Sequence, residues 1–350
     1  MKTISILITF FLCFIRIDAQ IPEYYSNVNF EQRGASLRLQ LSELITDTHQ
    51  TFLPYTSSAI DTWDVMRISD LFSQSSSSVL LIYGYDDEDE DFINDRTRDA
   101  YSTCHTSSCV GKWNREHVFA RSLSNPALTT NVPGPGTDVH NLRAADSQKN
   151  SQRSNRLFAD GSGNSGIVGG DFFFPGDEWK GDVARIIMYM HLRYPGQCNA
   201  VNTTVGQTNY AAQEDMPDLL LEWNQEDPVS DFELTRNDLI YSYQGNRNPF
   251  IDNPAIANYI WGGPEPNDSW NYFNQVDIYP IVCDDNINIV SNKTETKLDY
   301  SIINLNGDIV QSGKAFSDIN LENHSTGAYY LKLGFEENEK KFTIYIQNSN

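Results

Sequence analysis

Apolar residues recur at helical spacing in two stretches of the chain. In residues 34–50 the leucines and Ile45 fall broadly on one side, which predicts a helix there. A clearer pattern covers residues 181–194 and stops at Pro195, a residue that ends helices. Such a stripe is typical of core packing and not of a cofactor site. It consists of Val183, Ile187, Met190 and Tyr194.

Shorter signals predict further helices and strands between these two. Residues 144–159 contain no proline or glycine and predict a helix, as do residues 216–227. The runs 77–85 and 113–120 are rich in β-branched and aromatic residues, which favour strands. Residues 124–138 are interrupted by prolines and glycines, so they predict a loop.

The pattern changes near Cys283. From there to the end, short alternating stretches are separated by turns that contain glycine or asparagine, which predicts a small β-sandwich. We therefore predict an α+β fold with two domains, a mixed domain over residues 20–284 and a β-sandwich over residues 285–350. The sandwich contains no cluster of titratable residues that indicates chemistry.

Composition and charge narrow the functional classes. A chain of 350 residues with 39% hydrophobic residues is long enough for a large core and two domains. Its formal net charge of −22 argues against a general nucleic-acid-binding surface, because phosphates are repelled. The charge is uneven, however. Residues 86–91 are an acidic run, whereas residues 112–156 contain seven Lys and Arg against three acidic residues. A local basic window can still bind a polyanion.

The N-terminus has the features of a secretory signal peptide over residues 1–19. Lys2 is followed by an apolar run that is too short to span a bilayer, and cleavage is predicted after Ala19. Cys13 leaves open a lipid-anchored precursor, although Leu12 precedes it where a small residue is favoured. No later segment is apolar enough for a membrane span, so we expect a secreted or cell-surface protein.

Four cysteines remain after removal of the signal, and an even number in an exported chain favours two disulfides. Of the three possible pairings we favour Cys104–Cys109 with Cys198–Cys283, because the first pair closes a tight loop. A zinc site formed by Cys104, His105 and Cys109 is the alternative, which an oxidising compartment disfavours.

Residues 112–123 place Arg115, Glu116 and His117 side by side, and these suit phosphodiester hydrolysis. That reaction needs a base to activate water, a cation to stabilise the developing charge, and positive side chains to hold the phosphate. His117 is a suitable base, since imidazole is largely neutral at pH 7. Glu116 is a hard oxygen donor for Mg²⁺, which keeps several waters and takes few protein ligands.

The predicted 144–159 helix can supply the remaining groups. Asp146, Asn150 and Arg153 share one helical face. Asn150 would give Mg²⁺ its second protein oxygen, and Arg153 would hold the phosphate. Arg143 and Arg156 lie close enough in sequence to extend this contact.

A regular strand raises a geometric difficulty for this site. Adjacent residues on a strand point to opposite faces, so Glu116 and His117 enter one site only where the strand ends, twists or bulges. We therefore predict irregular backbone at residues 115–118.

Four ordered blocks of the sequence resemble the bacterial endonuclease I family of secreted or periplasmic nucleases. The blocks cover residues 114–122, 138–155, 180–194 and 220–252. The resemblance extends over roughly residues 20–280. It implies a ββα-metal (His-Me finger) core in the mixed domain, and cleavage of DNA, and often RNA, with little sequence preference.

The resemblance also implies roles for individual residues. His117 matches the general base, and Glu116 and Asn150 match the two protein ligands of a single Mg²⁺. Some relatives carry a substrate-binding arginine in a loop that here, at residues 124–137, contains none. Arg121, Arg143 or Arg153 must then contact the phosphate, and the sequence does not distinguish among them.

His140 and Asp182 lie inside matching blocks, and for both we favour structural roles. His140 is placed to position the loop that precedes it, and a backbone carbonyl of that loop would orient His117.

The C-terminal segment resembles the type IX secretion sorting domain of Bacteroidetes, which implies the secretion machinery as a partner. The function predicted is a secreted Mg²⁺-dependent endonuclease acting on DNA, with RNA as a further substrate. The alternatives are a catalytically inactive surface protein that binds nucleic acid or acts as an adhesin, and a phosphatase for small esters.

Overall fold

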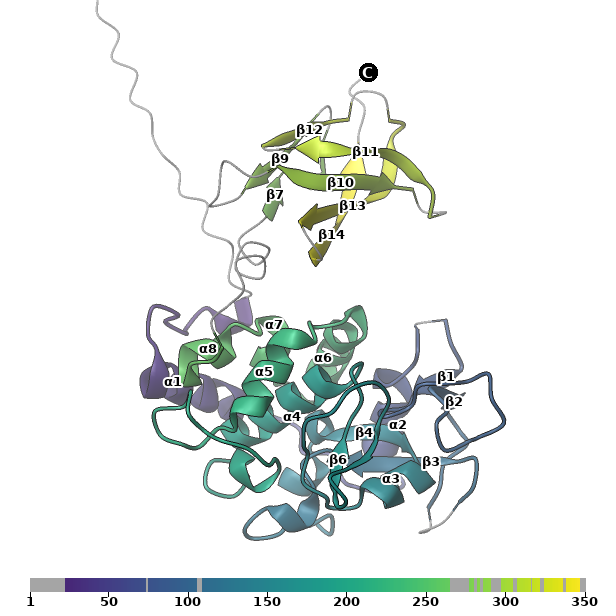
Figure 1. The fold of residues 1–350 in the computed structure, drawn as a ribbon, viewed down its shortest axis with the longest axis vertical. Helices are drawn as coiled ribbons and strands as arrows, with labels where there is room; N and C mark the ends of the chain where they lie inside the picture. The colour runs from purple at the N-terminus through teal and green to yellow at the C-terminus, as the bar shows by residue number, and fades with distance from the viewer. Residues whose placement is uncertain are drawn as a thin grey trace, which may run out of the picture. The chain divides into compact units, whose positions relative to one another are not determined.

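The computed structural model consists of two compact units, one ending at Gly263 and the other beginning at Pro264. Figure 1 draws both units. The predicted signal peptide lies outside the described residues. Among the helices that the structure describes, none has the length and apolarity needed to cross a bilayer. The described residues are 23–73, 75–105, 109–264, 277–279, 282–283, 286–290, 297–304, 307–315, 317–321, 324–335 and 338–346.

The first unit combines helices with three short antiparallel strand pairs, β1–β2, β3–β4 and β5–β6. In the view of Figure 1, α1 and α4 to α8 gather on one side, with β1 to β4, α2 and α3 on the other. The helices are α1 (Gly34–Asp47), α2 (Thr62–Ser69), α3 (Ser147–Arg153), α4 (Lys180–Arg193), α5 (Asp218–Glu226), α6 (Asp231–Gln244), α7 (Pro249–Asp252) and α8 (Ile256–Trp261). The strands are β1 (Ser78–Leu80), β2 (Thr97–Asp99), β3 (Trp113–His117), β4 (Leu142–Asp146), β5 (Gly166–Val168) and β6 (Phe172–Phe174).

Helix α4 forms the centre of the main core and is buried on every side. The predicted stripe therefore describes only part of its packing, because α1, α5 and α7 all contact it. Its polar side chains are buried in pairs, such as Arg185 with Glu233. In α1 the residues Leu37, Leu41 and Ile45 are buried, whereas Leu39 is exposed, as helical spacing requires.

Strand β3, strand β4 and helix α3 are packed together. The strands are antiparallel, with Trp113 opposite Asp146 and His117 opposite Leu142, and no register shift between them. Helix α3 follows β4 directly and contacts both strands. The Asp146 side chain caps it, accepting from the backbone N–H groups of Gln148 and Lys149 at 2.8 and 2.9 Å.

This arrangement corrects the helix predicted over residues 144–159. Ala144 and Ala145 belong to β4, where both are buried, and the helix ends at Arg153. An uninterrupted stretch without proline or glycine is compatible with a strand that turns sharply into a helix, so the composition alone did not locate the boundary.

The second unit is formed of strands in two sheets that share one apolar core. The five-stranded sheet has the order β11-β10-β13-β14-β8, and the three-stranded sheet the order β12-β9-β7. The domain boundary predicted after residue 284 falls inside this unit, because β7 pairs with β9 and β8 pairs with β14. The strands are β7 (Asp277–Tyr279), β8 (Val282–Cys283), β9 (Asn286–Val290), β10 (Leu298–Ile303), β11 (Ile309–Ala315), β12 (Asp318–Asn320), β13 (Gly327–Phe335) and β14 (Asn338–Ile346). The predicted α+β class is confirmed.

The cysteines confirm one predicted pair and contradict the other. Cys104 and Cys109 form a disulfide, which also excludes the alternative zinc site. Among the described cysteines Cys198 is a free thiol, fully buried in the core of the first unit, so its predicted bond to Cys283 is wrong. Burial raises the pKa of the Cys198 thiol to about 12, and the group is inert at neutral pH.

The half-buried carboxyl of Asp227 predicts how stability depends on pH. Burial, with Asp182 nearby, raises the pKa of Asp227 to about 7, while its side chain accepts from the Gly181 N–H at 2.8 Å. Because the pKa of Asp227 is higher in the folded state than in the unfolded state, protonated Asp227 adds to the unfolding free energy at low pH. This contribution is lost as the pH rises through 7. We expect Asp227→Asn, which keeps the acceptor, to remove on the order of 1 kcal/mol of the fall in unfolding free energy between pH 5 and pH 8. Urea titrations measure it.

The control for this prediction is Asp171→Asn, which removes a charge from an exposed side chain. Its pH profile should follow that of the wild type. An Asp227→Asn profile with the wild-type slope would show that Asp227 is not the group responsible.

Candidate active site

A cleft of about 560 Å³ opens beside the end of β3 and the start of the loop that follows it. Glu116, His117, Arg121 and Asn150 all line it. The imidazole, carboxylate and amide that the sequence analysis assigns to one site thus belong to residues that line one cleft. A second cavity, of about 280 Å³, lies between α2 and α6. Among its described lining residues Asp231 is the one acidic or basic side chain, so we assign the chemistry to the first cleft.

Glu116 is held through one of its two carboxylate oxygens. Oε1 accepts a hydrogen bond from the Tyr83 hydroxyl at 3.0 Å and lies 3.1 Å from Nη1 of Arg153. Within the described part of the chain, Oε2 has no bonding partner. The residue is 2% exposed, and burial raises the pKa of the Glu116 carboxyl to about 7. A cation in the cleft would favour the ionised carboxylate.

His117 presents one ring nitrogen to the protein and keeps the other free. Nε2–H donates to the carbonyl oxygen of Gly136 at 2.8 Å, since a carbonyl can only accept. Nδ1 therefore carries the lone pair, and no described residue bonds to it. The ring stacks on Tyr55 with centroids 5.7 Å apart. Burial lowers the pKa of His117 to about 4, which keeps the imidazole neutral at pH 7.

The carbonyl that orients His117 lies in the loop before His140, as expected. His140 itself is buried away from the cleft, where Nε2 donates to the carbonyl of Asn246 at 3.2 Å. It is a structural residue in this arrangement. Asp182 is likewise structural, because it is buried in an ion pair with Arg143.

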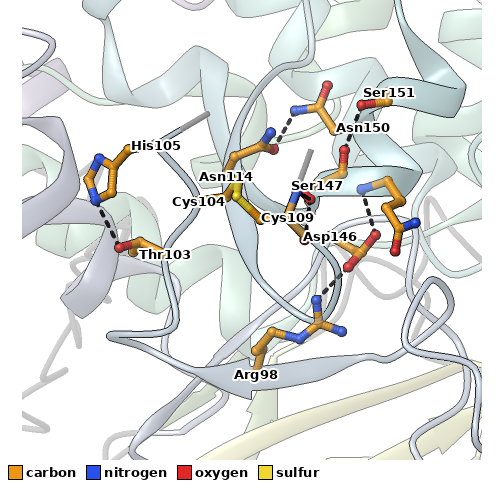
Figure 2. The surroundings of a disulfide bond; sticks show 11 residues. Arg98, Thr103, Cys104, His105, Cys109, Asn114, Asp146, Ser147, Asn150 and Ser151 are labelled. Atoms are coloured by element: carbon orange, nitrogen blue, oxygen red, sulfur yellow. Dashed lines mark hydrogen bonds and ion pairs between the residues drawn. A yellow bond between two sulfur atoms is a disulfide. The ribbon is translucent and has the colours of Figure 1, made fainter. Parts of the chain in front are cut away.

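Asn150 is oriented by a second asparagine. Its Nδ2 donates to Oδ1 of Asn114 at 2.8 Å, as Figure 2 shows. The amide oxygen of Asn150 is then left without a hydrogen bond from the described residues. Asn114 precedes Glu116 by two positions on β3, so the two side chains leave the same face of the strand. The contact between the asparagines therefore places Asn150 against the face that carries Glu116.

Irregular backbone was predicted at residues 115–118, and this prediction is wrong for residues 115–117, which belong to a regular strand. Pairing with β4 continues without a bulge through His117, which is the last residue of β3. Both Glu116 and His117 reach the cleft because the strand ends at His117. On the face of β3 opposite to Glu116, Arg115 and His117 both contact Tyr55.

Two of the three predicted phosphate-binding arginines are committed elsewhere. Arg153 is fully buried, and its guanidinium donates to the carbonyls of His117 and Val118 in addition to pairing with Glu116. Arg143 is buried against Asp182 and does not line the cleft. Neither is available to a phosphate, so their predicted roles are corrected.

Arg121 is the remaining candidate, and its position fits. It is exposed and lines the cleft, while its Nε donates to the carbonyl of Leu128 at 2.9 Å. The terminal N–H groups of its guanidinium have no other partner among the described residues. Arg156 is instead paired with Asp171 at 3.2 Å.

Sequence reasoning missed three residues that shape the site. Asn114 was detectable, since strand periodicity places it beside Glu116. Tyr55 and Tyr83 were not, because both come from loops distant along the chain and follow no motif.

Gly136 gives a prediction about the orientation of the base. A Cβ at this position would lie 2.1 Å from the carbonyl oxygen of Thr129, so a side chain must displace the loop. Gly136→Ala should therefore move the carbonyl that holds His117 and lower kcat by roughly 10-fold or more, the scale of one misplaced base. Steady-state kinetics measure this. The control is Gly166→Ala, because Gly166 on β5 has open space where a Cβ would stand and does not line the cleft. Equal kcat values for wild type and Gly136→Ala would contradict this role.

The donors present fit a hard divalent cation. Glu116 Oε2 and Asn150 Oδ1 are oxygen atoms that line the same cleft and lack other partners among the described residues. The described residues contain no group of three His, Cys, Asp or Glu side chains able to hold a metal. A cation here would therefore take one carboxylate, one amide and several waters, which is the pattern that suits Mg²⁺.

Comparison with known proteins identifies the family to which the chain belongs. The Endonuclease I family profile matches residues 33–255, a range that contains every residue of the cleft. The chain belongs to the Endonuclease I family. Two similar proteins are the extracellular ribonucleases of Bacillus subtilis (strain 168) and Bacillus amyloliquefaciens. Each is 35% identical over 254 residues, which is 80% of its own length and 69% or 70% of this chain.

This endonuclease I family member is a secreted nuclease, a hydrolase of phosphodiester bonds. Residues 277–347 match the secretion system C-terminal sorting domain, a type IX sorting signal. The protein is therefore secreted or attached to the cell surface, and its partners are a nucleic acid and the secretion machinery.

Proposed function

We propose that this protein is a Mg²⁺-dependent endonuclease that cleaves DNA and RNA with little sequence preference. One observation supports it most strongly. The free Nδ1 of His117, Oε2 of Glu116 and Oδ1 of Asn150 belong to residues that line a single cleft. We further propose that β3, β4 and α3 form a ββα-metal unit, with Glu116 and Asn150 as ligands of one Mg²⁺.

The residues of the cleft perform the reaction as follows. His117 Nδ1 accepts a proton from a water molecule, whose oxygen attacks the phosphorus in line with the 3′-oxygen. The P–O3′ bond breaks, the 3′-oxygen takes up a proton from solvent, and the phosphate remains on the 5′ end. Gly136 holds the imidazole in the required tautomer through Nε2. Arg121 contacts a non-bridging oxygen of the phosphate. When bound to Glu116 and Asn150, Mg²⁺ supplies the positive charge that offsets charge developing in the transition state.

A panel of substrates tests this proposal. The purified protein is given supercoiled plasmid, single-stranded RNA and a nucleotide monoester, each with Mg²⁺ and with EDTA. We expect nicked plasmid and shortened RNA in Mg²⁺, no cleavage in EDTA, and an intact monoester. Binding of plasmid without cleavage would favour the inactive binding protein. Hydrolysis of the monoester alone would favour the phosphatase.

Arg121 gives a prediction about phosphate binding. A charge-assisted hydrogen bond contributes roughly 1.5–3 kcal/mol, so Arg121→Ala should lower kcat/KM by about 10- to 100-fold. Removing one phosphate contact should also reduce the salt dependence of binding by about one unit of slope. Arg156→Ala is the control, because Arg156 pairs with Asp171 and does not line the cleft. If Arg121→Ala and Arg156→Ala have the same kcat/KM, the phosphate contact is assigned to the wrong residue.

We also propose that residues 1–19 are a signal peptide and that the C-terminal unit is a β-sandwich serving as the export address.

A further inference from the structure

Tyr83 has an unusual backbone conformation for a buried side chain. It follows β1 and adopts a φ of 73°, in the left-handed region that residues other than glycine rarely occupy. Its side chain is fully buried. Such conformations persist only where the surroundings fix them, and they concentrate at functional sites.

Several contacts fix this turn. The carbonyl of Tyr83 accepts from the Ser165 hydroxyl at 2.6 Å, and its ring packs edge-on against Phe173. The next residue, Gly84, accepts from the indole N–H of Trp179 at 2.8 Å. A Cβ on Gly84 would lie 2.1 Å from the carbonyl oxygen of Asp95, so only glycine fits. The turn therefore aims the tyrosine in one direction.

That direction is the Glu116 carboxylate. The Tyr83 hydroxyl donates to Oε1 at 3.0 Å, and Arg153 approaches the same oxygen at 3.1 Å. Arg153 is shared, because its guanidinium also donates to the carbonyls of His117 and Val118. Without the Tyr83 hydroxyl, the Glu116 carboxylate could rotate and offer both of its oxygens to the buried Arg153 guanidinium.

We propose that Tyr83 is a positioning residue that, with Arg153, holds Oε1 of Glu116 so that Oε2 faces the cleft and its divalent cation. This inference rests on the proposed function, since it takes Glu116 as a ligand. In this arrangement Arg153 supports the metal ligand Glu116 and does not contact the phosphate.

Isothermal titration of the full chain with MgCl₂ tests the role of Tyr83. Tyr83→Phe removes the hydroxyl and keeps the ring. Partners that orient a ligand typically contribute 10–100-fold to metal affinity, so we expect Mg²⁺ to bind at least about 10-fold more weakly. Plasmid nicking should need correspondingly more Mg²⁺, with kcat at saturating Mg²⁺ close to that of the wild type.

The matched control is Tyr25→Phe. Tyr25 is also a buried tyrosine that donates to a carboxylate, that of Asp252, and it does not line the cleft. It should lose stability comparably and bind Mg²⁺ as the wild type does. Equal Mg²⁺ affinity in Tyr83→Phe and wild type would overturn the inference.

Two further experiments distinguish failure of the Tyr83 role from failure of the proposed metal ligands. If Glu116→Gln abolishes Mg²⁺ binding while Tyr83→Phe does not change it, only the positioning role fails. If Mg²⁺ binding does not depend on Glu116 at all, the proposed ligand set fails, and the inference fails with it. In wild-type crystals soaked with Mn²⁺, Oε1 should stay on Tyr83. A cation bound through Oε1 would overturn the positioning role without relying on any variant.

Discussion

Replacing His117 with alanine should lower plasmid nicking at saturating Mg²⁺ by about 10²–10⁴-fold, the usual contribution of a general base. Among the described residues that line the cleft, the variant loses the one unpartnered imidazole nitrogen, whereas Glu116 and Asn150 stay in place. We therefore expect Mg²⁺ affinity to be unchanged while kcat falls. Nicking rates and calorimetric Mg²⁺ titrations on the same preparation separate the two effects.

The control for this variant is His105→Ala. His105 is exposed, contacts Thr103 and Trp63, and does not line the cleft. It should nick plasmid at the wild-type rate. A His117→Ala variant that cuts as fast as the wild type would show that another group activates the water.

Replacing Glu116 with glutamine should have the second large effect. The change keeps the size of the side chain but removes the negative charge that a cation requires. Groups that only hydrogen-bond to a metal ligand typically contribute about 10–100-fold to metal affinity. Loss of a ligand itself should therefore weaken Mg²⁺ binding by at least about 100-fold. Asn150→Ala should have a smaller effect that high Mg²⁺ partly restores, since a water can replace a neutral amide.

Glu226→Gln is the control for Glu116→Gln. Glu226 is a half-exposed carboxylate that pairs with Lys180 outside the cleft. It should leave the Mg²⁺ titration unchanged. Unchanged titrations for both Glu116→Gln and Asn150→Ala would mean that the ligands have been misassigned.

The sequence predicted those parts of the site that depend on local pattern. The strand that carries Glu116 and His117, the helix that carries Asn150, and the Cys104–Cys109 loop were each indicated by short-range signals. The carbonyl that orients His117 also lies in the expected loop. The C-terminal unit begins earlier than predicted, and one reason is that β8 pairs with β14, a strand distant along the chain, which local pattern does not reveal.

The parts that failed depend on burial, which spacing does not reveal. Arg143, Arg153 and Arg121 are equivalent as sequence letters, yet the first two are buried in ion pairs and the third is exposed. Cys198 belongs to an even set of four cysteines in the sequence, but it lies in the core of the first unit as a buried free thiol. The sequence pattern predicts Asp146 inside the helix, whereas Asp146 is the last residue of β4 and its side chain caps α3.

The most direct test of the central claim is a crystal structure with Mn²⁺, located by its anomalous signal. We predict one ion in the cleft, bound at about 2.1 Å by Glu116 Oε2 and Asn150 Oδ1, with His117 Nδ1 facing the cleft and not bound to the ion. An ion held by other residues, or an ion bonded to His117 Nδ1, would contradict the account.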